Sequence, residues 1–117
     1  MTDPREHLPL TPHVFQVLVA ISDGPLHGYA IIQEVARLTD GVIVMRTGTL
    51  YLLLQRLLDH GFIVESRHRE KREDDDERRR YYELTPLGRA VLRAEAKRLE
   101  RAVAVVRRKG LLSRLRP

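Results

Sequence analysis

The sequence of 117 residues contains neither cysteine nor tryptophan. Without cysteine the chain can form no disulfide and no thiolate metal site, which fits a reducing compartment. Its longest apolar run, Val14 to Ile21, is interrupted by Gln16 and falls far short of the roughly 20 residues that span a bilayer. No charged-then-apolar segment opens the chain as a secretion signal would. We therefore expect a soluble, cytoplasmic protein, and the length predicts one domain.

Motifs for catalysis and metal binding are also lacking. There is no glycine-rich phosphate loop and no nucleophile elbow. The five histidines match no spacing of metal ligands: His7, His13, His27, His60 and His68. We expect no metal, no cofactor and no enzymatic activity, and we expect His27 to cap or pack at the start of a helix.

Charge is abundant but unevenly distributed. The net charge of +5 and the isoelectric point near 10.1 suggest a polyanionic partner. Residues 1–64 hold four basic and six acidic side chains, a net of −2, whereas residues 89–117 hold ten basic and two acidic, a net of +8. Residues 65–80 hold seven of each sign, sorted into an acidic tip at 73–77 between two groups of basic residues. The excess positive charge is therefore at the C-terminal end.

The segment from Thr47 to Gly61 reads as one helix with two apparent boundaries. Thr47 is expected to cap its start, and Gly61 can adopt the left-handed conformation that ends it. One side is apolar, and we assign it to the core: Leu50, Leu53, Leu54, Leu57 and Leu58. The other side carries Leu52, Gln55, Arg56 and Asp59. Hydroxyls, an amide, an arginine and an apolar side chain suit a DNA major groove, although a plain surface helix with one stray leucine fits this pattern equally well.

Two helices are predicted before this one. Residues 1–10 look like a frayed arm. Thr11-Pro12 then starts a helix that runs to about Ser22, and a second runs from about His27 to Thr39. The apolar residues 42–45 form either a short strand or a simple link. Three helices, the third with a polar face, are typical of a helix-turn-helix.

After Gly61 the apolar residues alternate, with Phe62 and Val64 before a charged tip and Tyr82 and Leu84 after it. This pattern predicts a β-hairpin, and a hairpin that follows a recognition helix is the wing of a winged helix. Tyr81 and its neighbour Tyr82 should point to opposite sides of the strand. Carboxylates are repelled by phosphates, so we expect the arginines beside the acidic tip to approach a duplex.

A last helix is predicted from Thr85-Pro86 to about Arg108. Its apolar residues follow steps of four and three, which indicates a seam that a second copy would cover. The first helix is apolar nearly all round, so it should share this interface. We predict a homodimer with interface residues Phe15, Leu18, Leu92, Ala96, Leu99, Val103 and Val106. A pocket for an apolar effector could lie there, lined by Phe15, Gln16, Leu18, Leu99 and Val103.

The predicted architecture is mainly α with a small β-hairpin: a winged helix-turn-helix followed by a long C-terminal dimerisation helix. We divide the chain into an arm (1–10), a DNA-binding domain (11–85), a dimerisation helix (86–109) and a basic tail (110–117). The tail could bind phosphates, pack across the dimer or stay disordered. The residues expected to contact double-stranded DNA are Tyr29, Arg46, Thr47, Thr49, Tyr51, Leu52, Gln55, Arg56, Arg69, Lys71, Arg72, Arg78, Arg79 and Arg80.

The chain contains three motifs by which it resembles the PadR family of bacterial winged-helix transcriptional regulators, in the family's short form with a single C-terminal helix. They are HGY at 27–29, GTLY at 48–51 and RRYYELT at 79–85. The resemblance covers about Leu10 to Leu111. It implies a dimeric regulator, usually a repressor, that binds palindromic operators and often responds to a small aromatic compound at the dimer interface.

The chain departs from the family at two points. Arg46-Thr47 stand where family members commonly carry serine or proline, and the last helix has no tryptophan. Neither the operator sequence nor the ligand identity is therefore transferred. The alternative interpretation is a protein-interaction module that has lost DNA binding, supported by the acidic tip and by the altered flank of the GTLY motif. Salt dependence separates the two, because neutralisation of phosphates by several arginines makes affinity fall steeply with salt.

Overall fold

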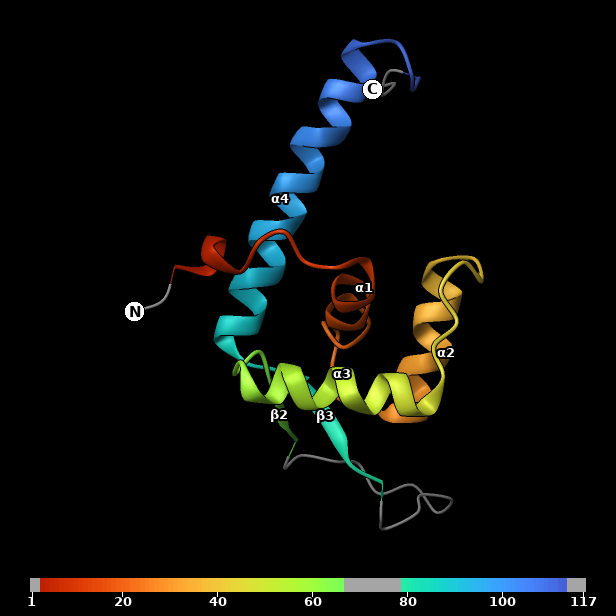
Figure 1. Cartoon of the computed structure of the whole chain (residues 1–117), viewed down its shortest axis with the longest axis vertical. Helices are drawn as coiled ribbons and strands as arrows, with labels where there is room; N and C mark the ends of the chain where they lie inside the picture. The colour runs from red at the N-terminus through yellow and green to blue at the C-terminus, as the bar shows by residue number, and fades with distance from the viewer. Residues whose placement is uncertain (1–2, 67–78, 114–117) are drawn as a thin grey trace.

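The computed structural model describes residues 3–66 and 79–113 of the chain. Its helices are η1 (Pro4–His7), α1 (Pro12–Ala20), α2 (Gly28–Leu38), α3 (Thr47–Asp59) and α4 (Pro86–Arg108). Its strands are β1 (Leu26–His27), β2 (Ile63–Glu65) and β3 (Tyr81–Leu84). The α1 helix stands between α2 and α4, α3 crosses beneath them, and the strands lie below α3 (Figure 1). The predicted winged helix with a long C-terminal helix is confirmed.

The sheet has one strand more than the predicted hairpin. Its order is β1-β3-β2 and both pairings are antiparallel, with Ile63 opposite Leu84 and Leu26 opposite Tyr82. A strand of two residues is too short for an alternating pattern to reveal, and only its pairing with β3 defines it. Residues 42–45 form a link without a strand, held at Ile43, whose N–H donates to Thr39 Oγ1 at 3.0 Å.

Side chains cap three of the four α-helices. The Thr11 hydroxyl accepts from the Val14 N–H at 3.3 Å, and the Thr85 hydroxyl accepts from the Gly88 N–H at 2.9 Å. His27 caps α2 as expected, with Nδ1 accepting from the Ala30 N–H at 3.2 Å. The predicted cap of α3 was wrong. Thr47 is the first helical residue, because the extended cap conformation falls on Arg46, which makes no capping bond with its side chain.

The core gathers one face from each of α1, α2, α3 and the sheet. Leu50, Leu54 and Leu57 of α3 are buried as predicted, whereas Leu53 and Leu58, also assigned to the core face, are half-buried at its edges. The other core residues are Val17, Leu18, Ala20, Ile21, Ile31, Val35, Met45, Phe62, Ile63, Tyr82 and Val91. This packing leaves the polar side of α3 at the surface.

The start of α4 is locked to the end of α3. The Thr85 hydroxyl donates to the Gly61 carbonyl at 2.6 Å, and the Thr85 N–H donates to the Phe62 carbonyl at 3.0 Å. A Cβ at Gly88 would stand 1.9 Å from the Phe62 carbonyl oxygen, so only glycine permits this approach. The joint fixes the direction in which α4 leaves the domain.

The N-terminal arm is not frayed over its described part. Residues 3–10 cross α4 on the way to α1 (Figure 1), and η1 contacts this helix. The Leu10 N–H donates to Glu95 Oε2 at 2.7 Å. Glu95 is 1% exposed and is paired with Arg98 on the next turn. The prediction failed because Leu8 and Leu10 find apolar contacts on the core and because the arm's partner, Glu95, is 85 residues away.

Candidate nucleic-acid interface

A cleft of about 510 Å³ opens between the first turn of α2, one side of α3 and the outer part of the sheet. Aromatic and charged side chains dominate its walls, and its floor is apolar. The lining residues are His27, Gly28, Tyr29, Tyr51, Leu54, Gln55, Leu58, Glu65, Arg79, Arg80 and Tyr82.

Five residues that the sequence assigned to DNA contact meet in this cleft although they come from three different elements. Tyr29 lies on α2 and is 62% exposed, and Tyr51 lies on α3 and is 49% exposed. Gln55 lies one turn further along α3, and Arg79 and Arg80 precede β3 directly. The fold therefore brings together two phenol hydroxyls, an amide and two guanidinium groups on one exposed surface.

The contact between Gly28 and Tyr51 joins two of the sequence motifs in space. A Cβ at Gly28 would stand 2.8 Å from the Tyr51 Oη, so the missing side chain lets the Tyr51 ring lie over the start of α2. The glycine of the first motif thus makes room for the tyrosine of the second. Sequence analysis missed Gly28 as a site residue, because this pairing is visible only when α2 and α3 are packed.

His27 was also missed as a site residue, although its capping role was predicted. Its Nδ1 accepts a backbone hydrogen bond in capping α2, so the neutral ring carries its proton on Nε2. Arg79 Nη1 lies 3.4 Å from this Nε2, and the Tyr81 ring meets the imidazole edge-on at 5.3 Å. Because both of these nitrogens then carry protons, the approach of Arg79 is not a hydrogen bond. The pairing of His27 with Tyr81 in the sheet and the contact of their rings hold the beginning of β3 beside the cap of α2 and so place Arg79 at the cleft.

Arg80 and Tyr82 complete the wall formed by the sheet. Arg80 Nε is 4.0 Å from Glu65 Oε1, and both side chains are well exposed, so water screens this pair. Burial raises the pKa of the Tyr82 hydroxyl above its usual value, and the group stays protonated at neutral pH. Arg69, Lys71, Arg72 and Arg78, which were also assigned to DNA contact, lie outside the described residues.

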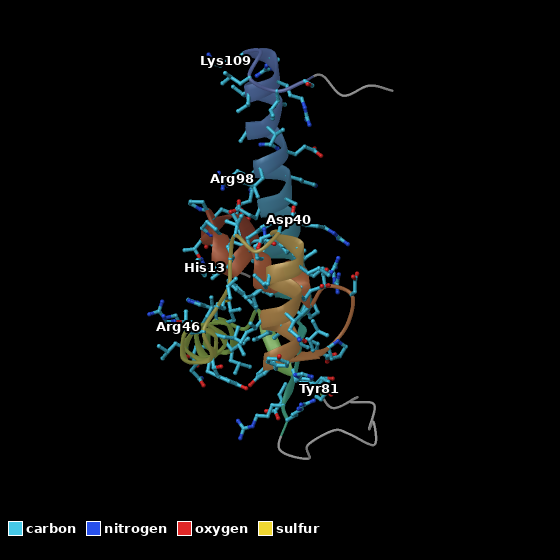
Figure 2. All side chains as sticks on the ribbon, turned by 90° about the vertical axis from the view of Figure 1, so that its right-hand side faces the viewer. His13, Asp40, Arg46, Tyr81, Arg98 and Lys109 are labelled. Atoms are coloured by element: carbon cyan, nitrogen blue, oxygen red, sulfur yellow. The ribbon has the colours of Figure 1, made fainter. Side chains whose placement is uncertain are left out.

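The outward side of α3 presents the remaining predicted contacts to solvent. Leu52 is 70% exposed. The other predicted contacts on this helix and its cap are likewise exposed: Arg46, Thr47, Thr49 and Arg56. Arg46 extends from the start of α3 on the side away from Tyr81 (Figure 2). Gln55 Nε2 donates to Asp59 Oδ1 at 3.1 Å. Because a carboxylate can only accept, this bond turns the amide nitrogen toward Asp59 and leaves Oε1 able to accept from a ligand.

One residue predicted for the dimer interface and the effector pocket is wrongly assigned. Leu18 is 0% exposed within a single chain, where α1 packs on the core, so it offers no surface to a partner or a ligand. The other residues of the two sets keep some exposure: Phe15, Gln16, Leu92, Ala96, Leu99, Val103 and Val106. Leu92 also packs on the core of its own chain. None of the residues predicted to line the effector pocket lines the cleft.

Within residues 3–66 and 79–113, no group of three His, Asp or Glu side chains is arranged to hold a metal ion. None of the helices in these ranges is long and apolar enough to cross a membrane.

Comparisons with known proteins agree with this geometry. The model of the "Transcriptional regulator PadR-like family" matches residues 17–94. A transcriptional regulator from Clostridium thermocellum is 26% identical, with a TM-score of 0.65 over 82% of this chain and 87% of that chain. A PadR family transcription regulator from Clostridium difficile is 21% identical, with a TM-score of 0.69 over 84% of this chain and 97% of that one. Bacillus subtilis PadR, solved in complex with operator DNA, is 23% identical, with a TM-score of 0.60 over 74% of this chain and 46% of that chain. No curated protein sequence matches the chain.

Proposed function

We propose that this chain, which belongs to the PadR-like family of transcriptional regulators, acts as a repressor that binds an inverted-repeat operator as a homodimer. It is a DNA-binding regulator of transcription and not an enzyme. The observation that carries the proposal is the convergence of Tyr29, Tyr51, Gln55, Arg79 and Arg80 on one cleft beside the exposed side of α3. Bacillus subtilis PadR, which has a similar fold, is found with operator DNA.

The two parts of this surface suit different parts of a duplex. Guanidinium and phenol groups at the cleft bind phosphate oxygens, and these contacts position a protein without reading sequence. The side of α3 that carries Thr49, Leu52 and Gln55 offers a hydroxyl, an apolar group and an amide, which match base edges and the thymine methyl in a major groove. We therefore assign positioning to Arg79 and Arg80, and base reading to α3.

The distal half of α4 supports the homodimer. This half rises clear of the other elements (Figure 1), and apolar side chains along it remain at least partly exposed. Val103 is 36% exposed and Leu99 is half-buried. A partner's α4 that covers this seam would remove apolar area from water at roughly 25 cal/mol per Å². Two DNA-binding domains joined by a rigid seam would bind an inverted repeat much more tightly than one domain would.

An apolar or aromatic effector belongs to the same proposal, at the interface between α1 and α4. With Leu18 removed from the set, Phe15, Leu99 and Val103 supply apolar surface and Gln16 supplies one polar group. A thermal-shift screen of aromatic and aliphatic compounds, repeated with bound operator DNA, tests this part. A compound that raises the melting temperature and releases DNA is the expected inducer, whereas a screen without such a compound would count against regulation by an effector.

The assignment of roles is tested with two single variants. Arg79→Ala should weaken binding to specific and random duplexes alike and reduce the salt slope by about one unit. Gln55→Ala should mainly remove discrimination, at about 1–3 kcal/mol on the operator obtained by selection from a random pool. Equal losses on all sequences for both variants would refute the division of roles. If neither variant altered DNA affinity, the alternative of a protein-interaction module would be favoured.

A further inference from the structure

Four cations form a line along the outer side of α4. Arg93, Lys97, Arg101 and Arg108 are all exposed, and none of them forms an ion pair with a residue that the structure describes. Their spacing of four, four and seven residues keeps them on one side of a helix that turns about 100° per residue. We call these four residues the α4 basic stripe. The alanines Ala90, Ala94 and Ala104 lie among them, and Glu100 borders them.

The α4 basic stripe lies opposite the apolar seam. At about 100° per residue, the centre of the stripe is roughly 140° around the helix from the centre of the seam that includes Leu99 and Val103. The side of α4 that packs on its own domain carries Val91 and Glu95, which are buried. Neither the core of the chain nor a partner helix on the seam would therefore cover the stripe.

The stripe is also distant from the surface assigned to the operator. Along the longest axis, Lys109 lies at one end of the described molecule, and Arg46 and Tyr81 lie toward the other (Figure 2). The molecule extends 51 Å along that axis. A straight duplex held by α3 and the sheet lies at the Tyr81 end and leaves the distal part of the stripe unoccupied. The charge distribution also distinguishes these two regions, because residues 1–64, which include α3, carry a net charge of −2, whereas residues 89–117 carry a net charge of +8.

We propose that the α4 basic stripe binds the phosphate backbone of a second DNA segment, so that one molecule bridges two duplexes. When the four cations of the stripe bind phosphates, they release counterions condensed on DNA, and this release favours binding. Successive charges four residues apart are about 6 Å apart along the helix, so they can follow a strand of phosphates. The face has no aromatic or amide side chain that could read a base, so this binding should be independent of sequence. An acidic protein would fit less well, because the stripe has only alanine methyls to anchor it.

A capture experiment tests this proposal without knowledge of the operator. A short duplex of arbitrary sequence is fixed to beads and covered with protein, and a second duplex with a fluorescent label is added at low salt. The wild-type protein should hold the second duplex on the beads. The variant R93Q/K97Q/R101Q/R108Q should still bind the first duplex but hold at least about tenfold less of the second, and its salt slope on free duplex should fall by about two to four units.

A charge-keeping variant provides the matched control. R93K/R101K/R108K preserves all four positive charges and should behave like the wild type. Glutamine and lysine are both good helix formers, so the melting temperature and helical content should be the same in all three proteins. This comparison separates lost charge from a damaged helix.

Three outcomes would overturn the proposal. If the glutamine variant holds the second duplex as well as the wild type does, bridging comes from the two DNA-binding domains of a dimer. If the wild type covers the beads but holds no second duplex, the stripe is only a solvated face. If labelled polyglutamate binds the wild type and not the glutamine variant while capture of DNA is unchanged, the stripe docks an acidic protein. Failure of the wild type to bind the first duplex would instead contradict the proposed function.

Discussion

The domain formed by α1, α2, α3 and the sheet differs from α4 in both packing and charge. Nearly all the buried apolar side chains belong to the domain, whereas α4 contributes Val91 and then leaves the core. Residues 1–64 are slightly acidic, whereas residues 89–117 have a net charge of +8. The part that we propose reads DNA thus offers a few directed polar groups, whereas the excess positive charge is concentrated on α4 and the residues after it. Recognition and charge can therefore be altered separately.

The joint between the two regions should be the most sensitive point. Gly88→Ala would drive a methyl group into the Phe62 carbonyl, which is backbone and cannot move aside without displacing α4. We expect a loss of about 3–5 kcal/mol in the free energy of unfolding, in the upper tail for single substitutions. Denaturant unfolding measures it. Gly48→Ala is the control, because a Cβ there meets nothing within 4 Å and should leave stability unchanged or slightly higher. Equal stability of both variants would show that the joint is not rigid.

The seam on α4 should be the next most sensitive. Leu99→Asp would place two carboxylates near the two-fold axis of the proposed dimer, at a cost of several kcal/mol per dimer. Sedimentation should show a monomer or a partly unfolded chain that loses operator binding and keeps weak, salt-sensitive binding to any duplex. Ala104→Asp introduces the same charge on the exposed outer side and should remain dimeric. A dimeric Leu99→Asp protein with normal operator affinity would place the dimer contact elsewhere, most simply on α1.

Glu95 ties the arm to α4 and should make stability depend on pH. Arg98, and to a smaller extent the Leu10 N–H, lower the pKa of the Glu95 carboxyl below its ordinary value of 4.5, against the opposing effect of burial. Since the folded pKa is lowered, this stabilisation is complete above pH 4.5 and is lost as the pH falls from there through the folded pKa. Glu95→Gln should be less stable than the wild type by about 1.5–3 kcal/mol at neutral pH, and this deficit should shrink across that acid window.

Thermal unfolding as a function of pH measures the effect of Glu95. Glu100→Gln removes an exposed carboxylate from the same helix and should leave the curve unchanged. A constant difference between wild type and Glu95→Gln at all pH values would show that packing, and not the charge of Glu95, holds the arm.

The smallest effect should come from Asp59, which orients the Gln55 amide that we propose reads bases. Asp59→Ala frees Gln55 to rotate and should reduce discrimination between operator and random duplex by about 0.5–1 kcal/mol. The same change removes a negative charge from the last residue of α3, where the helix dipole disfavours it, so the fold should gain about 0.3–1 kcal/mol. Competition binding and thermal unfolding measure the two effects. Asp59→Asn keeps an acceptor for Gln55 and should retain discrimination; if it lost as much as Asp59→Ala, the hydrogen bond would have no role in reading.

The sequence by itself determined the features that depend on residues close together in the chain. Thr11 and Thr85 marked helix starts because a capping hydroxyl bonds an N–H three residues ahead. The exposure of Leu52 and the burial of Leu50 followed from one helical turn. The winged helix followed from the order of such local patterns. The cap of α3 was misplaced by a single residue, because the capping preference of threonine did not decide where the extended conformation falls: it falls on Arg46.

Only the tertiary structure decided which of these patterns meet. The residues of the cleft come from α2, α3, all three strands and the two residues before β3, and the fit of Tyr51 over Gly28 depends on the packing of two helices. Leu18 was assigned to an interface because its periodicity marks it only as apolar, and the packing of α1 within one chain buries it completely. The same holds for β1 and for the bond between Leu10 and Glu95 across 85 residues. Local patterns show that a side chain needs a partner, and the free energy of the whole fold decides which one it finds.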